Sequence, residues 1–181
     1  MKNENHPNPY ETVLHLLRKQ EKAAPTKEAF MHMVCRVLQQ ELPHYDWVGY
    51  YLVDTESERE LVLGPYVGEP TEHVRIAFGQ GICGQAAERR ETYLSADVSQ
   101  ESNYLSCSLR VRSEIVVPII KDGKILGEID IGSHTVNAFG EADRQLLERL
   151  ARMTADRFQN SFCRGDPCGR PGYKLHLDCA C

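Results

Sequence analysis

Apolar residues recur every three or four positions in three segments, and this spacing predicts amphipathic helices. The first segment is YETVLHLLRKQ at 10–20, and the second is TKEAFMHMVCRVLQQEL at 26–42. Thr26 can cap the second helix, and Pro43 follows its end. The third segment, FGEADRQLLERLARMTADRF at 139–158, has acidic residues early and leucines on one face. We therefore expect two helices before the middle of the chain and one after it.

The middle of the chain is rich in β-branched and aromatic residues, as strands are. KDGK separates two apolar runs, and its Asp122-Gly123 pair predicts a hairpin turn. Pro118 cannot donate to a sheet ladder, so it requires a sheet edge or a bulge. Helices on either side of a strand-rich centre predict an α+β fold, with a central antiparallel sheet and helices packed on one face. The expected strands are WVGYYLV at 47–53, LVLGPYV at 61–67, SEIVVPII at 113–120 and ILGEIDIG at 125–132.

Length and composition favour a single globular domain. The chain has 181 residues, of which 41% are hydrophobic and 26% are charged. A net charge of −5 argues against nucleic-acid binding, because phosphate binding needs a clustered excess of Lys and Arg. No apolar run reaches the roughly 20 residues of a membrane-spanning helix, and MKNENHPNPY lacks the apolar core of a signal peptide. We expect a cytoplasmic protein that binds neither nucleic acid nor membrane.

The composition changes at both ends of the chain. Residues 1–9 are predicted to be disordered, residues 10–160 to form one domain, and residues 161–181 to form a Cys- and Gly-rich tail. Three interpretations of the tail remain open: a disordered natural extension, translated vector sequence, and a small metal clip. Its four cysteines do not have the spacing of a paired CxxC zinc site, so we predict no metal.

A glycine-rich stretch, FGQGICGQAAE at 78–88, surrounds Cys83 at a predicted strand-to-helix turn. Glycine permits the positive φ that such a turn requires. The first amides of the following helix carry a partial positive charge, which favours a thiolate or binds an anion. The other interpretation is a plain turn in which Cys83 is a small packed residue, and the motif alone does not decide between them.

A second cysteine, Cys107, lies in the polar segment SADVSQESNYLSCSLRVRSE. Such a segment predicts a long loop, on which Cys107 is accessible and Arg110 and Arg112 favour its thiolate. If the loop folds back, Cys83 and Cys107 form a reversible dithiol and disulfide couple. The alternative is two unrelated thiols, and sequence spacing does not choose between these arrangements.

Carboxylates occur inside two of the apolar strands. Glu114 begins SEIVVPI, and Glu128 and Asp130 share one face of GEIDIG. A buried carboxylate is costly unless it is paired or binds a cation, so Glu114 and Asp130 are candidates for holding an ammonium group. In the alternative interpretation, these two side chains face solvent at a sheet edge.

The motifs WVGYYLV, LVLGPYVGEP, VRIAFGQGICGQAAE, SADV, Cys107, SEIVVPII and GKILGEIDIGS occur in this order. The joint pattern resembles the free methionine-(R)-sulfoxide reductase family of GAF domains. The resemblance implies that residues 10–160 form a GAF domain, in a family that is often dimeric. It also implies a thiol reaction without a cofactor. One cysteine attacks the sulfur of free methionine sulfoxide and becomes a sulfenic acid, and a second cysteine forms a disulfide that thioredoxin reduces.

The same resemblance implies roles for single residues. Cys107 matches the attacking thiol, and Cys83 matches the cysteine of the glycine turn, which can condense with it. Trp47 and Tyr51 match aromatic residues that line the sulfoxide pocket. The carboxylates that polarise the sulfoxide or hold the amino group are matched by Glu114 and Asp130.

Three positions depart from the family pattern. His73 stands where a third cysteine is usual, Tyr104 stands where a histidine is usual, and Gly132 replaces a second acid. His73 and Tyr104 are therefore candidate pocket residues with altered chemistry. The leading hypothesis is a homodimeric enzyme that reduces free methionine-(R)-sulfoxide. The alternatives are a GAF sensor that binds a small amino-acid-like ligand without chemistry, and a thiol redox sensor.

Overall fold

The computed structural model describes residues 8–105 and 110–158. Cys107, the segment before residue 8 and the Cys-rich tail lie outside the described residues. The elements, in chain order, are α1 (Pro9–Gln20), the 3-10 helix η1 (Glu21–Ala23), α2 (Lys27–Glu41), β1 (Trp47–Val53), β2 (Glu60–Val67), β3 (Arg75–Ala77), α3 (Gly81–Arg89), β4 (Tyr93–Ser95), the 3-10 helix η2 (Val98–Gln100), β5 (Ser113–Lys121), β6 (Lys124–Ser133) and α4 (Glu141–Arg157).

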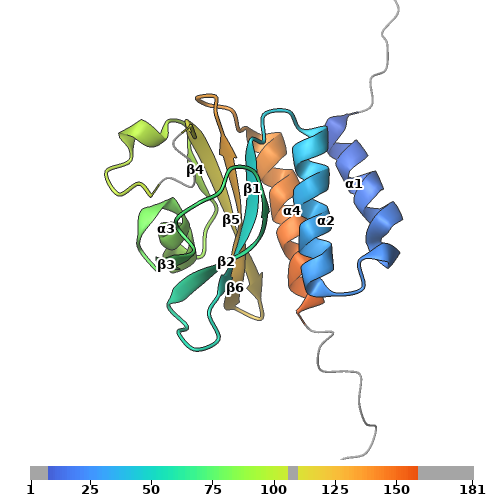
Figure 1. Cartoon of the computed structure of the whole chain (residues 1–181), viewed down its shortest axis with the longest axis horizontal. Helices are drawn as coiled ribbons and strands as arrows, with labels where there is room; N and C mark the ends of the chain where they lie inside the picture. The colour runs from blue at the N-terminus through green and yellow to red at the C-terminus, as the bar shows by residue number, and fades with distance from the viewer. Residues whose placement is uncertain (1–7, 106–109, 159–181) are drawn as a thin grey trace, which may run out of the picture.

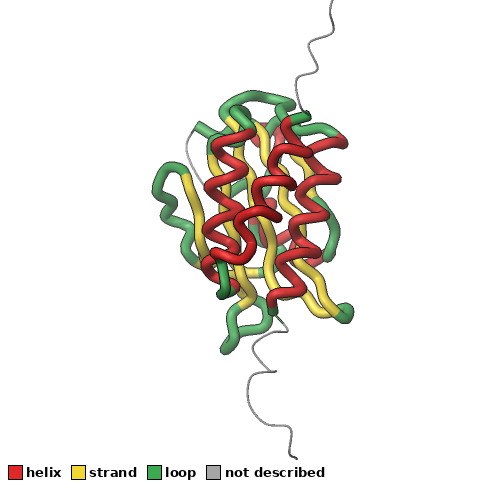
Figure 2. Tube along the Cα trace, turned by 90° about the vertical axis from the view of Figure 1, so that its right-hand side faces the viewer, coloured by secondary structure: helices red, strands yellow, loops and turns green. Residues whose placement is uncertain are grey.

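Six strands form one antiparallel sheet in the order β3-β2-β1-β6-β5-β4. Helices α2 and α4 pack on one face of this sheet, α1 packs on α2 and α4 on the side away from the strands, and the short helix α3 lies on the opposite face (Figure 1). Figure 2 shows the long helices in front of the strands. The predicted α+β architecture is therefore confirmed, and α3 adds a partial second layer on the face that the long helices leave open.

The sheet face under the long helices forms the main apolar core. Strand alternation points Ile129 and Ile131 of β6 at this side, where they belong to one cluster with Phe30 of α2 and Leu147 of α4. Cys35 of α2 is also buried there, and its thiol donates to the Pro65 carbonyl at 3.5 Å. Burial raises the pKa of the Cys35 thiol far above its ordinary value, which keeps it protonated and unreactive. Cys35 is a core residue.

Pro118 lies where a proline is tolerated. Strand β4 pairs with β5 only from Glu114 to Val116, so β5 has an open edge from Val117 onward. A register shift follows between Ile119 and Ile120 on the β6 side. The missing amide of Pro118 therefore costs no ladder bond with β4, as the prediction of an edge or a bulge required.

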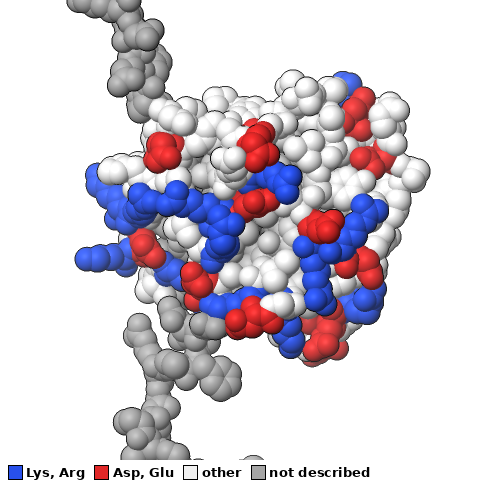
Figure 3. Space-filling model, turned by 180° about the vertical axis from the view of Figure 1, so that it is seen from behind, with Lys and Arg blue, Asp and Glu red and all other residues white. Residues whose placement is uncertain are grey.

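Surface charges are interspersed rather than separated by sign. Figure 3 shows Lys and Arg side chains alternating with Asp and Glu side chains over the face seen from behind. Ion pairs on the protein surface include Arg59 with Glu88 and Arg144 with Glu148. The positive side chains of that face therefore have negative ones beside them. Among the described helices, none has the length and apolar content needed to cross a bilayer.

A buried thiol and carboxylate cluster as candidate active site

The sheet face opposite the long helices carries acidic side chains instead of an all-apolar surface. Because alternate residues of a strand share a face, Glu128, Asp130 and Gly132 of β6 all point away from the main core. Antiparallel register places Glu114 of β5 beside Gly132 and Tyr51 of β1 beside Glu128. The sheet thus gathers three carboxylates, from two neighbouring strands, on its α3 side.

Helix α3 brings Cys83 to these carboxylates. Gly79 and Gly81 have φ values of +83° and +63°, and they turn the chain sharply from β3 into the helix. The Cys83 side chain then faces the sheet, where its thiol donates to Asp130 Oδ2 at 3.5 Å and to Glu114 Oε1 at 3.9 Å. Cys83 is buried, with 3% of its surface exposed. It therefore contacts two acids and does more than fill a tight turn.

Replacing Gly84 tests how tightly α3 packs against β3. An added Cβ at this position would lie 2.3 Å from the carbonyl oxygen of Ala77. We expect Gly84→Ala to push α3 away from β3 and to lower the free energy of unfolding by about 1–3 kcal/mol, as overpacking does. Denaturant unfolding measures this loss. The control is Glu88→Ala on the exposed face of the same helix, and equal losses for both variants would show that α3 can shift freely.

Burial gives the carboxylates unusual electrostatics. Glu114 is 1% exposed, and Glu128 and Asp130 are 0% exposed. Burial raises the pKa of Glu114 well above its ordinary value, and the nearby charge of Asp130 raises it further. Burial also raises the pKa of Glu128, and the Cys83 thiol offsets only part of that rise. Within the described residues, no Lys, Arg or His forms an ion pair with Glu114 or Glu128.

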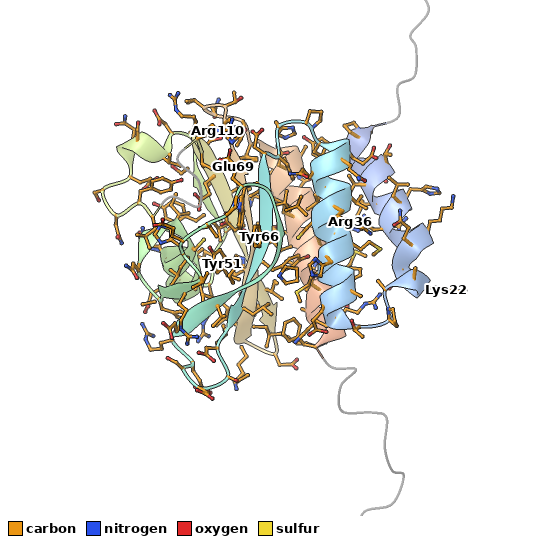
Figure 4. All side chains as sticks on the ribbon, in the orientation of Figure 1. Lys22, Arg36, Tyr51, Tyr66, Glu69 and Arg110 are labelled. Atoms are coloured by element: carbon orange, nitrogen blue, oxygen red, sulfur yellow. The ribbon has the colours of Figure 1, made fainter. Side chains whose placement is uncertain are left out.

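Aromatic rings form the wall beside the acids. Trp47 stacks on Tyr66 with ring centroids 5.6 Å apart, and it lies 6.4 Å from the ring of Tyr51. The Trp47 indole donates to the Glu69 carbonyl at 3.1 Å, and the Tyr51 hydroxyl donates to the His73 carbonyl at 2.7 Å. Figure 4 shows Tyr51, Tyr66, Glu69 and Arg110 on the side of the sheet away from α1 and α2. Backbone carbonyls thus hold the polar tips of Trp47 and Tyr51.

The structure brings most of the residues that the sequence singled out into one cluster. The solvent-facing alternative for Glu114 and Asp130 is wrong, since both are buried. The Tyr104 hydroxyl lies beside Glu114, where it opposes part of the rise in the pKa of that carboxyl. His73 contacts Tyr51 through its backbone carbonyl. The residues of the cluster are Trp47, Tyr51, Cys83, Tyr104, Glu114 and Asp130.

Sequence reasoning missed two members of this site. Glu128 was recognised only as sharing a face with Asp130, although a glutamate amid the apolar residues of that strand was itself a signal of a buried charge. Tyr66 belongs to β2, and nothing local in LVLGPYV shows that its ring stacks on Trp47. That contact comes from the pairing of β2 with β1, which places Tyr66 opposite Gly49.

Comparisons with known proteins identify the family of this chain. The GAF domain family model matches residues 24–159. An Escherichia coli protein named free methionine-R-sulfoxide reductase is 34% identical over 130 residues, which are 70% of this chain and 76% of that protein. This chain belongs to the free methionine-R-sulfoxide reductase family of GAF domains.

Other members of the family extend the likeness. A Saccharomyces cerevisiae protein of the same name is 40% identical over 109 residues, which are 60% of this chain and 60% of that protein. The X-ray structure of free methionine-R-sulfoxide reductase from Neisseria meningitidis in complex with its substrate has a TM-score of 0.77 and 34% identity. That likeness covers 86% of this chain and 93% of the Neisseria chain. The GAF fold expected from the motifs is thus confirmed at the level of the whole domain.

Proposed function

We propose that this protein reduces free methionine-(R)-sulfoxide to methionine. The observation that carries the proposal is the buried cluster of Cys83, Glu114 and Asp130 beside an aromatic wall. Family membership supports it, because relatives are named for this activity and one was solved with its substrate. A free amino acid sulfoxide carries an ammonium group, a polar S–O bond and an S-methyl group, and the cluster offers a complement to each of them.

Each part of the substrate has a proposed partner in the site. Asp130 holds the ammonium group, since a buried carboxylate favours a cation. Glu114, whose raised pKa keeps a proton on the carboxyl, donates a hydrogen bond to the sulfoxide oxygen and polarises the S–O bond. The apolar faces of Trp47 and Tyr51 contact the S-methyl group.

The proposed chemistry uses two cysteines in sequence. The Cys107 thiolate attacks the sulfur of the sulfoxide, the oxygen passes to the cysteine, and methionine leaves behind a sulfenic acid, Cys–SOH. Cys83 then attacks that sulfur, so that a disulfide forms and the oxygen departs as water. A dithiol of the thioredoxin class reduces the disulfide and restores both thiols. Cys107 lies outside the described residues, so its role rests on the sequence resemblance.

A coupled turnover assay tests this function. Oxidation of NADPH through thioredoxin reductase and thioredoxin should follow addition of methionine-(R)-sulfoxide, and the S epimer should give no signal. Cys107→Ser should abolish turnover, whereas Cys35→Ser, the matched control at a buried core thiol, should leave it unchanged. Equal rates for wild type and Cys107→Ser, or no rate from either, contradict the proposal.

A mass measurement tests the order of the thiol steps. After one equivalent of sulfoxide and no thioredoxin, we expect a peptide pair that links Cys83 to Cys107 and has lost two hydrogen atoms. A sulfenic acid trapped at Cys107 in Cys83→Ser would place Cys83 as the second thiol. A disulfide to any other cysteine would show that Cys83 is not the resolving residue.

A non-catalytic GAF sensor remains the second candidate, and the Gly132 position favours it. An added Cβ at Gly132 would lie 2.8 Å from Val111, so Val111 fills the space that an acidic side chain would occupy. A pocket with one acid fewer could bind an amino acid without reducing it. Calorimetry beside the turnover assay separates the two functions: binding without turnover supports the sensor. A peroxide-driven disulfide, with no response to sulfoxide, supports the thiol redox sensor.

The proposed assembly is a homodimer. The family resemblance motivates this expectation, because GAF domains of this kind often pair through their terminal helices. Light scattering coupled to size-exclusion chromatography measures the mass in solution. A mass of one chain of 20.6 kDa across the concentration range would contradict it.

A further inference from the structure

The cluster has the geometry of a metal site as well as that of a thiol active site. One ligand atom each from Cys83, Glu114 and Asp130 lie within 4.8 Å of one another, and all three residues are buried. A tetrahedral zinc ion, with Zn–S near 2.3 Å and Zn–O near 2.1 Å, separates its sulfur and oxygen ligands by about 3.6 Å. The thiol of Cys83 lies 3.5 Å from Asp130 Oδ2 and 3.9 Å from Glu114 Oε1. Both distances are close to a tetrahedral edge.

A second observation points to a cation here. Glu128 is fully buried on the same strand face as Asp130, and neither of its carboxylate oxygens has a hydrogen-bond partner among the described residues. Glu114 Oε2 likewise lacks one. Buried carboxylate oxygens are normally hydrogen-bonded, and those that are not require an explanation such as a bound ion. The unpaired oxygens of Glu128 and Glu114 therefore favour a bound cation.

We propose that Cys83, Glu114 and Asp130 bind a thiophilic divalent cation of the Zn²⁺ class when no substrate is present. The thiol selects the metal, because Mg²⁺ and Ca²⁺ prefer all-oxygen sites, whereas Zn²⁺ accepts mixed sulfur and oxygen ligands. Charge also favours the ion, because a thiolate and two carboxylates carry three negative charges against its two positive charges. Protons leave the bound groups as the metal enters.

This metal site goes beyond the proposed reductase activity, and a bound metal would inhibit that activity. The metal would occupy the resolving thiol and both carboxylates that the substrate needs, so metal and methionine sulfoxide exclude each other. Metal-bound Cys83 is also shielded from oxidants and from disulfide exchange, because its sulfur lone pair is engaged. No sequence spacing predicts this group, since its ligands come from α3, β5 and β6.

Cobalt titration tests the site with a readout that needs no turnover. The full chain is prepared reduced and metal-free, with the tail cysteines at 163, 168, 179 and 181 changed to serine so that they bind no metal. Added Co²⁺ should produce one saturating thiolate-to-cobalt charge-transfer band in the near ultraviolet, and Zn²⁺ should displace it. In the same background, Cys83→Ser should abolish the band, and Cys35→Ser, the buried thiol away from the cluster, should leave it unchanged.

Two carboxylate variants keep the test decisive if Cys83→Ser does not fold. Glu114→Gln should weaken cobalt binding by at least about tenfold, and Glu128→Gln by roughly tenfold to a hundredfold, which is the usual effect of losing a group beside the ligands. Circular dichroism confirms the fold of each variant. A band that persists in folded Cys83→Ser, or an affinity that neither carboxylate variant lowers, overturns the proposal. A reductase assay that fails leaves this result unaffected.

Discussion

Replacing Glu114 with Gln is expected to lower the kcat for methionine-(R)-sulfoxide by roughly 10²- to 10⁴-fold, the usual contribution of a positioned proton donor. Gln keeps the size of the side chain and can still donate a hydrogen bond, but it cannot give a proton to the departing oxygen. The wild-type carboxyl is suited to that step because burial and Asp130 raise its pKa. The coupled NADPH assay with metal-free protein measures the loss.

A matched control separates the loss of the proton donor from a general effect of replacing Glu with Gln. Glu88→Gln makes the same change at an exposed residue of α3, which forms an ion pair with Arg59 at the surface. We expect its kcat to equal that of wild type. Glu114→Gln should also unfold at no lower temperature than wild type, because the neutral amide has the size and the charge of the protonated carboxyl. An unchanged kcat with a raised KM would instead make Glu114 a residue that only binds the substrate.

Replacing Asp143 with Ala is expected to lower the free energy of unfolding by about 3 kcal/mol, near the lower end of what breaking a buried charged network costs. Asp143 lies in the first turn of α4, and its Oδ2 accepts from the Gly140 amide at 2.8 Å. Its Oδ1 accepts from the hydroxyls of Tyr10 at 3.1 Å and Tyr45 at 3.0 Å, and it lies 2.8 Å from His44 Nε2. One carboxylate therefore joins α1, the loop before β1 and α4.

Truncation at this position leaves several donors without an acceptor. Tyr45 is 1% exposed, so its hydroxyl cannot turn to solvent. Asp143→Asn keeps one amide oxygen for Gly140 and should therefore cost less than Asp143→Ala. Urea unfolding of both variants measures the difference. If Ala and Asn cost the same, the hydrogen bonds to Oδ1 and Oδ2 do not account for the stability of this junction.

The same network gives a pH dependence with a defined sign. Burial alone would raise the pKa of Asp143, but the hydrogen bonds from His44, Gly140 and Tyr45 outweigh it, and the pKa lies below its ordinary value of 3.8. Because its pKa is depressed in the folded state, the Asp143 carboxylate adds stability at pH values above 3.8. This stability is lost as the pH falls through the lower folded-state pKa. The difference in the free energy of unfolding between wild type and Asp143→Asn should therefore be smaller in acid than at neutral pH.

Local sequence patterns predicted much of the fold. Leu146, Leu147 and Leu150 recur at helical spacing and are buried along α4. Asp122-Gly123 forms the turn between β5 and β6, with φ values of +49° and +73°. Thr26 caps α2 through a hydrogen bond from the Ala29 amide at 3.1 Å. Each of these features depends on residues within a few positions of one another, which is why the sequence suffices to predict it.

Local patterns did not predict contacts between segments that are far apart along the chain. Whether Glu114 and Asp130 face solvent or the interior depends on which side of the sheet α3 covers. The stacking of Tyr66 on Trp47 depends on the register between β2 and β1. His73 enters the site by its carbonyl, and no side-chain pattern encodes the use of a backbone atom.

By itself, the sequence determined the helices, the hairpin, the antiparallel sheet and the presence of a thiol in a glycine turn, because periodicity and turn chemistry are local. The motif order also determined the family. Only the tertiary structure decided that Cys83, Glu114 and Asp130 meet within one buried cluster and that Glu128 joins it. The physical reason is that burial and charge coupling arise between elements that are far apart along the chain, and packing alone fixes those distances.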